Sequence, residues 1–326
     1  MIVALIQLGK FHTEIIGGLI NALLRPHISI ILYSSKYSSS FVPYYKKIFN
    51  NNNNIRWKYT NKYKNLKEKI EKDCDLYVFM TGHEYEILQT NPYKTFLITH
   101  ITDDINYYNS FDTCGQIALS PVFKKEKIRY FLNIFEAPQY IKTTKQLEIC
   151  IVGFTNPYNK DLDNFFLLLK YISQNNNKVK NRKILFNIIN YYKLPKKFHN
   201  YEKSGLIKSY TDITASRTMK IIGKSDYVLV LARENSSYHT KQLSGIIPLA
   251  ISVNTPLICD KKLAKIYSMS RISITYNFKD NYLLKAIQTA SQKDKSKLLI
   301  NIKKFRQKIM KKNKTFRFPC LKNNKL

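Results

Sequence analysis

The chain carries two short apolar runs on either side of a polar loop and a helical stretch, between Ser225 and Asp260. Tyr227 to Ala232 is a continuous apolar run of strand length, and a second run starts at Leu257. Thr255-Pro256 stops the helical stretch just before that second run. A strand, a helix and another strand in this order are typical of a parallel sheet, so the segment predicts an α/β fold.

The polar loop after Ala232 is the first candidate binding site. In open parallel sheets, ligands bind at the carboxyl ends of the strands. A helix is expected to begin near Leu243, and the free N–H groups at a helix N-terminus favour phosphate. The loop places Arg233, Glu234 and His239 at the expected site, and Lys241, Ser244 and Gly245 near the helix N-terminus form a candidate anion-binding cradle. The alternative is that this loop is merely solvated.

Apolar runs alternate with helical patterns along the rest of the chain, in two series. The first series runs from residue 1 to about residue 119, and the second restarts at Leu147 after a basic stretch that contains Pro138. We expect two Rossmann-like doubly wound domains that face each other across a cleft, with the substrate site in the cleft. The expected domains are residues 1–140 and 141–326, and the second ends in a basic helix and tail.

The segment LGKFHTEIIGGL after the first apolar run places His12 at the carboxyl end of a predicted strand. Histidine can accept a proton near neutral pH, so His12 is a candidate catalytic base. The alternative is that Thr13 caps a helix and His12 is simply exposed. Gly17 and Gly18 lie inside the predicted helix and cost it stability, which predicts close approach of another backbone or a ligand.

Three other strand ends carry polar residues. His83 follows the predicted strand 75–80 and is a second catalytic candidate. Asp103 and Asp104 follow the predicted strand 95–101, and they either supply a carboxylate base or cap a helix. Gly153 opens the loop GFTNPYNKD, which suits a phosphate or an acceptor but is also compatible with a plain turn.

Length and composition exclude several classes of protein. The chain has 326 residues and 44% hydrophobic residues, enough for two domains with real cores. It has no run of about 18 apolar residues, and its first residues lack the basic lead of a signal peptide, so we expect a cytoplasmic protein without a transmembrane segment. No two cysteines form a CxxC pair, and Cys74, Cys150 and Cys259 lie in or beside apolar runs, which predicts buried free thiols. Nothing in the sequence supports a metal site.

The formal net charge of +32 would ordinarily indicate a nucleic-acid partner. The chain is also rich in Asn, Ile and Tyr, which share A/T-rich codons with Lys, so a biased genome explains much of the lysine content. Only the clustering of charge is then informative. It is densest in residues 301–326, which hold ten Lys and Arg and no acid. This pattern is either a nucleic-acid or membrane-surface contact or a solvated tail.

Common enzyme motifs are absent: the chain has no P-loop, GxSxG, HExxH, protein-kinase set or GxGxxG. Its second half instead resembles the nucleotide-sugar-binding domain of GT-B glycosyltransferases, particularly the large retaining families. The matching stretches are SDYVLVLA at 225–232 and PLAISVNTPLI at 248–258. Residues 238–256 are also similar to glycosyltransferase-like proteins of giant viruses and algae, through an LSGxxPLAxS core.

This resemblance implies that residues 1–140 form the acceptor-side domain and residues 141–326 the nucleotide-sugar donor domain. It also implies specific roles for the loop residues. Arg233, His239 and Lys241 would bind the diphosphate of the donor, since basic side chains and helix N-termini rather than a metal neutralise the leaving group in this fold. Leu249 stands where these families place the glutamate that binds the donor ribose, and Asn254 stands where they place a glycine before Thr-Pro. Glu234 would then supply the missing carboxylate.

The sequence therefore predicts a metal-independent glycosyltransferase that needs no cofactor besides its donor substrate. It would transfer a sugar from a nucleoside diphosphate to a glycan, a protein or a small molecule, in a host cytoplasm, a viral factory or a virion. The alternative is a non-catalytic basic scaffold of the same fold that binds nucleic acid, in part through its basic tail, or another virion component. A different enzyme on paired Rossmann domains, such as a sugar-nucleotide epimerase, is a third possibility because a fold alone does not set the function.

Overall fold

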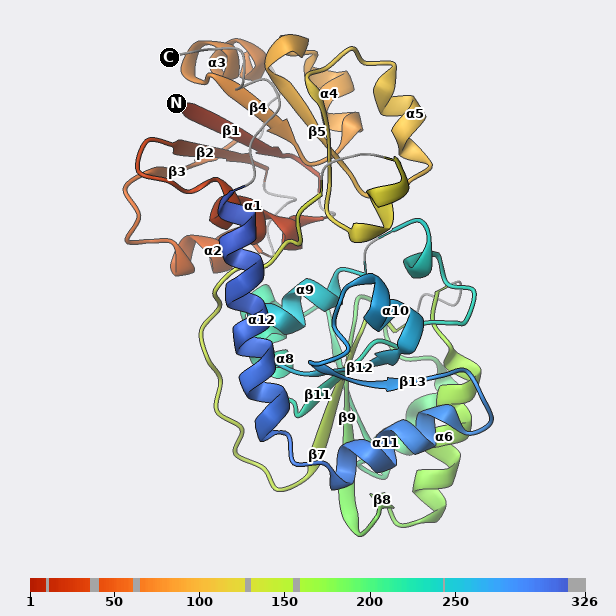
Figure 1. Cartoon of the computed structure of the whole chain (residues 1–326). Coiled ribbons are helices and arrows are strands. Elements are labelled where there is room, and N and C mark those ends of the chain that lie inside the picture. Colours follow the sequence, from red (N-terminus) through yellow and green to blue (C-terminus); the bar gives the residue numbers. More distant parts are fainter. Residues whose placement is uncertain are drawn as a thin grey trace. The chain divides into compact units, whose positions relative to one another are not determined.

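The structure of the chain is a computed structural model, which describes residues 1–9, 12–35, 41–60, 65–126, 130–154, 159–242 and 244–315. The chain divides into two units (Figure 1). Unit 1 comprises Met1–Phe135 together with Lys241–Leu243 and Lys308–Leu326, and unit 2 comprises Glu136–Thr240 and Ser244–Gln307. The units therefore differ from the predicted division at residue 140, because two later segments group with unit 1.

The described residues of unit 1 form a six-stranded parallel sheet in the order β3-β2-β1-β4-β5-β6. The strands are β1 (Ile2–Gln7), β2 (Ser29–Ser34), β3 (Ile55–Tyr59), β4 (Leu76–Phe79), β5 (Thr95–Thr99) and β6 (Gly115–Ala118). The helices are α1 (Ile16–Leu23), α2 (Val42–Ile48), α3 (Leu66–Asp73), α4 (Gly82–Leu88) and α5 (Asp104–Asn109). The central strands are apolar on both faces, as a sheet covered by helices on both sides requires.

The sheet of unit 2 has the order β10-β9-β7-β11-β12-β13, in which every neighbouring pair is parallel, and β8 pairs antiparallel with β9. The strands are β7 (Leu147–Val152), β8 (Lys178–Val179), β9 (Arg182–Asn190), β10 (Ile207–Thr211), β11 (Tyr227–Leu229), β12 (Leu257–Asp260) and β13 (Ser273–Tyr276). The helices are α6 (Leu162–Gln174), α7 (His199–Lys203), α8 (Ala215–Lys224), α9 (Ile246–Ser252), α10 (Lys261–Ile266), α11 (Tyr282–Gln292) and α12 (Ser296–Lys314).

Helices cover both faces of the sheet in unit 2. Helices α6 and α11 pack together on one face, while α8 and α9 contact each other on the other face (Figure 1). The strand order accounts for this arrangement, since the chain moves from β7 toward β10 and then returns past β7 toward β13, and crossovers of one hand place the helices of these two halves on opposite faces.

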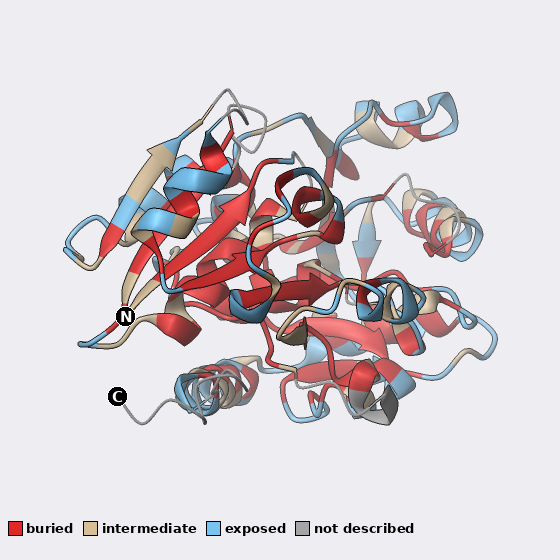
Figure 2. Cartoon of the chain, turned by 90° about the horizontal axis from the view of Figure 1, so that it is seen from above, coloured by how far each residue is buried: buried red, intermediate tan, exposed pale blue. Residues whose placement is uncertain are grey.

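Burial follows the same layers. Strands are buried almost throughout, whereas the outward sides of the helices are exposed (Figure 2). Four fully buried phenylalanines hold the core of unit 2 in edge-to-face contacts, with ring centroids 5.0 to 5.4 Å apart. These are Phe154, Phe165, Phe186 and Phe198. The predicted burial of the thiols of Cys74, Cys150 and Cys259 is confirmed, and all three are free.

The predicted fold class is confirmed, since both units are parallel sheets with Rossmann-like topology. One strand is shorter than expected. Strand β11 ends at Leu229 rather than Ala232, although residues 230–232 are fully buried. The N–H of Ala232 donates to the carbonyl of Val230, and this turn carries the chain away from the sheet.

The expected close approach at Gly17 and Gly18 is confirmed in unit 1. A Cβ added at Gly18 would lie 2.6 Å from the Cα of Asn133, and one added at Gly17 would collide with the ring of Tyr45. The partner is therefore another part of the chain rather than a ligand. The side chain of Asn133 donates to the carbonyl of Glu14 at 3.1 Å, which fixes the segment against α1.

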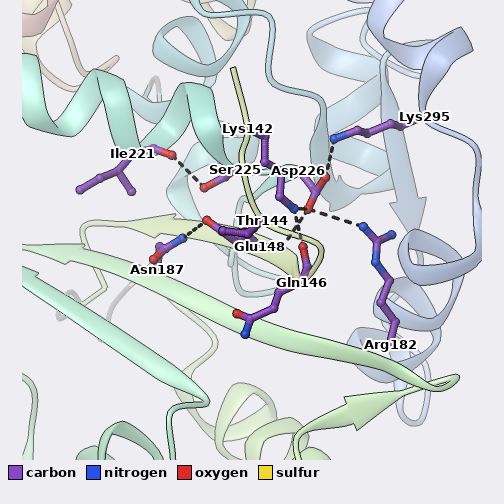
Figure 3. A network of polar contacts seen from close by, with 10 residues as sticks. All are labelled: Lys142, Thr144, Gln146, Glu148, Arg182, Asn187, Ile221, Ser225, Asp226 and Lys295. Atoms are coloured by element: carbon purple, nitrogen blue, oxygen red, sulfur yellow. Dashed lines mark hydrogen bonds and ion pairs between the residues drawn. The ribbon is translucent and has the colours of Figure 1, made fainter. Parts of the chain in front are cut away.

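A buried carboxylate, Asp226, connects four segments at the amino-terminal end of the unit 2 sheet (Figure 3). Only 2% of its side chain is exposed. It accepts hydrogen bonds from Lys142 and Lys295 and, at 2.9 Å, from the backbone N–H of Glu148. The guanidinium of Arg182 lies 3.9 Å away. Burial raises the pKa of Asp226, but the bonds from the two lysines and the N–H outweigh it and hold that pKa below 3.8.

Replacing Asp226 by Asn should destabilise the protein, because the change leaves three cations gathered around a neutral side chain. Removing one partner of a buried ion pair costs about 3 kcal/mol or more. The measurement is the free energy of unfolding in urea. Asp212→Asn is the matched control, since Asp212 is an exposed turn residue with a φ of 48° that asparagine tolerates. Equal losses in the two variants would contradict a structural role for the network.

Candidate functional site

Each sheet has a topological switch point at its first strand, which lies between two strands that come later in the chain. In unit 1 this point lies between β1 and β4, and in unit 2 it lies between β7 and β11. The loops after such a pair turn to opposite faces, which opens a crevice at the carboxyl ends of the strands. Both units gather polar side chains at this crevice.

In unit 1, the carboxylate of Glu84 bridges the two loops of the switch point. Glu84 lies in the first turn of α4, just after β4, and its Oε1 accepts from the backbone N–H groups of Leu8 and Gly9 at 2.6 and 2.9 Å. Its Oε2 is buried and has no hydrogen-bond partner among the described residues. Burial raises the pKa of Glu84 from 4.5 to about 7, although these N–H bonds oppose the increase.

His12 follows β1 in the same unit and lies in a small cluster with His100 and Glu14. The rings of His12 and His100 stack with centroids 3.8 Å apart, and Nδ1 of His12 is 3.8 Å from Oε1 of Glu14. His12 has a φ of 62°, a left-handed conformation that is uncommon for a residue with a side chain. Such backbone strain persists where the surrounding structure holds it, often at functional sites.

The cluster combines one neutral imidazole with one charged carboxylate. Nε2 of His100 donates to the carbonyl of Met80 at 2.7 Å, since a carbonyl only accepts, and its Nδ1 therefore carries no proton. Burial and the charge of His12 lower the pKa of His100 to about 3, so this ring stays neutral. For Glu14, burial raises the pKa, but the hydrogen bond and charge of His12 outweigh it and the pKa falls below 4.5. His12 is thus positioned between an acceptor and an anion.

The other unit 1 candidates lie outside this cluster. The side chain of His83 is 79% exposed and approaches only Glu86, at 3.4 Å. Asp103 occupies the N-cap position of α5 but makes no capping bond; it accepts from Lys241 at 2.8 Å instead. The backbone N–H of Thr102 also donates to the carbonyl of Lys241. Lys241 was predicted beside the diphosphate, and the structure groups it with unit 1 residues.

In unit 2, the loops after β7 and β11 are joined by a network of hydrogen bonds. Oδ1 of Asn159 accepts from the hydroxyls of Ser236 and Ser237 at 3.2 and 2.7 Å. The N–H of Arg233 donates to the carbonyl of Asn159, and Nε of Arg233 donates to the carbonyl of Lys160. These bonds fix two long loops against each other at the switch point.

Lys160 is the unusual residue of this network. Lys160 is only 2% exposed. Its ammonium group forms no ion pair with any carboxylate of the described residues. Its Nζ lies 5.5 Å from the ring centroid of Tyr238, a cation–π contact. Burial lowers the pKa of Lys160 from 10.5 to about 8. A buried cation without a counter-ion is costly, and an anionic ligand would relieve that cost.

Two other predicted donor residues, Gly153 and Arg233, come from the loops after β7 and β11. Gly153 follows β7 directly with a φ of 67°, and a Cβ there would meet nothing within 4 Å, so the backbone borders open space. The guanidinium of Arg233 is 44% exposed and lies 3.7 Å from the carboxylate of Asp163. Glu234 is exposed at the start of the loop, and no contact with the described residues fixes its carboxylate.

His239 is buried against Asp260, whereas the sequence placed it among the residues that bind the donor. Its Nε2 lies 3.0 Å from Oδ2 of Asp260, and both side chains are only 1% exposed. Asp260 also caps α10 through Leu263. The pair therefore anchors the loop to the end of β12. Ser244 is buried, and Gly245 occupies the N-cap position of α9 without a side-chain cap.

Comparison with solved structures shows which fold carries this geometry. An α-glucosyltransferase in complex with UDP matches with a TM-score of 0.63 and 10% identity, covering 95% of each chain. AviGT4, a glycosyltransferase involved in avilamycin A biosynthesis, matches with a TM-score of 0.60 and 10% identity, covering 96% of this chain and 95% of that one. The chain has the GT-B fold.

A further match with this GT-B fold is α-glucosyltransferase in complex with UDP-glucose and DNA containing an abasic site. Its TM-score is 0.61 at 10% identity, and the match covers 98% of this chain and 97% of that one. No protein-family model matches the sequence, and no curated protein matches it. At this low sequence identity, the solved structures show only the fold, and the role of each residue depends on its contacts in this chain.

The sequence placed Glu84 with His83 in the stretch 82–84 after a predicted strand, and Lys160 in the loop GFTNPYNKD, but it gave neither residue a role of its own. It missed His100, which lies inside the predicted strand 95–101. Burial was the missing signal, because Lys160 resembles any lysine of a basic loop. The rest of its loop, residues 155–158, and the basic tail from residue 316 lie outside the described residues.

Two further properties of the described residues concern metal ions and membranes. No three His, Cys, Asp or Glu side chains gather closely enough to hold a metal ion within the described residues. Among the helices formed by these residues, none is long and apolar enough to cross a membrane.

Replacing Glu84 by Gln should change how stability depends on pH. Glu84 has a raised pKa in the folded state, so it contributes most stability below pH 4.5 and loses that contribution as the pH rises to about 7. A change from 4.5 to about 7, at 1.36 kcal/mol per unit, corresponds to about 3 kcal/mol. The amide oxygen of the glutamine in E84Q can still accept the two N–H bonds, but the amide does not ionise.

The measurement is the difference in unfolding free energy between wild type and E84Q, taken at several pH values from 4.5 to 8. We expect the wild type to lose about 3 kcal/mol relative to the variant between pH 4.5 and 7, and nothing more above pH 8. All other titrating groups are common to both proteins and cancel. A difference that stays constant with pH would contradict the raised pKa.

Proposed function

We propose that the chain is a glycosyltransferase whose unit 2 binds the diphosphate of a nucleoside-diphosphate sugar at Lys160. The single observation that carries this proposal is a buried lysine, without a counter-ion among the described residues, at the switch point of the unit 2 sheet. Support comes from the fold, because structures with the same fold hold UDP and UDP-glucose. A diphosphate would neutralise Lys160 and accept its hydrogen bonds.

The neighbours of Lys160 suit a pyrophosphate group. The side chain of Arg233 is partly exposed, and its Nε bond to the carbonyl of Lys160 leaves Nη1 for a second phosphate. Its Nη2 lies 3.7 Å from the exposed carboxylate of Asp163, which a phosphate would replace as the partner. Gly153 lets a ligand approach the backbone closely because no Cβ stands in the way. We propose that these three residues, rather than Lys241, neutralise the leaving group without a metal.

The ribose contact of this site would differ from the resembling families. Leu249 occupies the position of their ribose-binding glutamate, and it is buried within α9. An apolar residue cannot accept hydrogen bonds from ribose hydroxyls. The proposed affinity therefore depends on the phosphates more than on the sugar of the nucleotide, with Glu234 as the nearest loop carboxylate along the chain.

Replacing Lys160 by Met should weaken the binding of UDP or GDP by at least tenfold while preserving or raising the melting temperature. A charged hydrogen bond contributes about 1.5 to 3 kcal/mol to binding, and removing a buried unpaired charge relieves the folded state of a cost. Isothermal titration calorimetry and thermal unfolding measure the two effects. K170M is the matched control, because Lys170 is exposed on α6 of the same unit.

The UDP affinity measured in the same titration should also depend on pH. The pKa of free Lys160 is about 8, so the wild type should lose UDP affinity as the pH rises through 8 to 9.5, and K160M should not. Unchanged UDP affinity in K160M would overturn the donor site. Parallel pH profiles in the two proteins would overturn the role of the lysine charge.

We propose His12 as the residue that accepts the proton of the acceptor hydroxyl, with Glu14 as its charged partner. The stacked His100 stays neutral and so does not compete for the proton. His83 was the other candidate, but its ring is largely exposed and contacts only Glu86. The geometry does not identify the acceptor. DNA is the first acceptor to test, because a structure of this fold holds DNA and this chain has a charge of +32.

Replacing His12 by Gln should lower turnover by about a hundredfold or more while leaving UDP affinity unchanged, as expected for loss of a general base. The assay is release of UDP from UDP-glucose, with water, duplex DNA or simple glycosides as acceptor. H83Q is the control and should retain nearly full activity. Equal activity of H12Q and wild type would exclude His12 as the base without affecting the donor-site proposal.

A further inference from the structure

Unit 2 has a second candidate site, a basic pocket on the α8 side of its sheet at the edge strand β10. The cavity has a volume of about 440 Å³, within the range of small-molecule sites. Its walls come from β10 and from α8 and the residue before it. It exists because α8 runs from the edge strand back to the centre of the sheet and packs on β7, which leaves the outer part of that face uncovered.

Four cations line this pocket, and none of its described lining residues is an acid: the cations are Lys208, Arg217, Lys220 and Lys224. None of them forms a salt bridge with a carboxylate in the part of the chain that the structure describes. The contrast with Asp226 in the same unit is direct, because there three cations share one carboxylate. Here the positive charge is left uncompensated by the described residues.

The spacing of these charges costs the helix stability. Arg217, Lys220 and Lys224 recur at i, i+3 and i+7 on the side of α8 that faces the pocket, whereas Met219 and Ile222 are buried on its other side. Like charges three or four residues apart on a helix repel each other. Arg217 also lies in the first turn, where the helix dipole disfavours a cation, and no acid in that turn compensates. A lysine-rich composition explains many lysines but not their convergence on one cavity.

Tyr210 orders two of the four cations. Nζ of Lys208 lies 5.6 Å from the centroid of its ring, and Cζ of Arg217 lies 5.5 Å from it. The hydroxyl of Tyr210 bonds Oδ1 of Asn187 at 3.3 Å, which fixes the ring on the sheet. The cations are therefore positioned before a ligand arrives, and the ring is already occupied by them rather than open for a base to stack.

We propose that this pocket binds a compact anion that carries two or more phosphoryl groups. Four converging cations match the charge of such a ligand, and a cavity of about 440 Å³ holds it without an extended track for a polymer. The pocket is separate from the proposed donor site, since it contains none of the residues at the switch point of β7 and β11. The inference does not depend on the chain being a glycosyltransferase.

The test is calorimetric titration of inorganic tripolyphosphate into the full chain at about 150 mM salt, where exposed charges are largely screened. It is carried out in K160M, in which phosphate binding at the proposed donor site is weakened, and all pocket variants are made in this background. We expect saturable binding of one ligand, weakened at least tenfold by the double change Arg217→Gln and Lys220→Gln. The control is Lys285→Gln with Lys303→Gln, which removes the same charge from exposed positions of α11 and α12 and should change affinity less than twofold.

Two outcomes would overturn the proposal. Equal weakening in the pocket variant and the control variant would mean that the ligand senses only the total charge. Stronger binding of a single-stranded dodecanucleotide than of tripolyphosphate, lost in the pocket variant, would assign the pocket to a nucleic-acid backbone instead of a compact ligand. Thermal unfolding checks that both double variants fold, and relief of like-charge repulsion should leave the pocket variant at least as stable as its parent.

Discussion

The structure depends on how each parallel sheet closes its switch point, where two adjacent strands send their loops to opposite faces. Backbone N–H groups and carbonyls there lose their sheet partners and must find others if they are buried. Unit 1 solves this with a single carboxylate, since Glu84 binds the N–H groups of Leu8 and Gly9. Unit 2 solves it with paired loops, in which Arg233 and Ser236 donate to the carbonyls of Asn159 and Lys160 and to Oδ1 of Asn159. The residues that close each switch point also position the polar groups around it.

Two buried charges of unit 2 show how structural and ligand-binding groups can be told apart. Asp226 lies at the amino-terminal end of the sheet and has three hydrogen-bond donors, so its desolvation is compensated within the chain. Lys160 lies at the carboxyl end and, within the described chain, its charge meets only the face of Tyr238. The pKa of Asp226 is held down by its partners, whereas that of Lys160 falls to about 8 because burial dominates there. Charge that is compensated stabilises the fold, and charge that is not compensated is suited to a ligand.

Much of the fold could be predicted from the sequence because buried parallel strands are continuous apolar runs. The helices α7 and α10 were missed, and α5 was anticipated only through the capping alternative for Asp103 and Asp104, since helices of five or six residues carry little more than one period of any pattern. The site could be predicted only to the level of strand ends. Lys241 follows the same strand as Arg233, yet its carbonyl bonds Thr102 and its Nζ bonds Asp103 of unit 1. No local sequence pattern shows which residues the far end of a loop will contact. Nor does it show that Lys160 is buried while Arg233 remains partly exposed.

The combination of Lys160 with Leu249 bears on what kind of donor such a site would select. A site that holds phosphate with a buried cation gains most of its affinity from charge, which every nucleoside diphosphate offers equally. A ribose-binding glutamate adds hydrogen bonds that only the correct sugar hydroxyls can complete, and a leucine adds none. Discrimination between donors would then come from contacts to the transferred sugar and to the base. If loops outside this phosphate site supplied those contacts, the same strand ends could serve different donors with little change in the sheet.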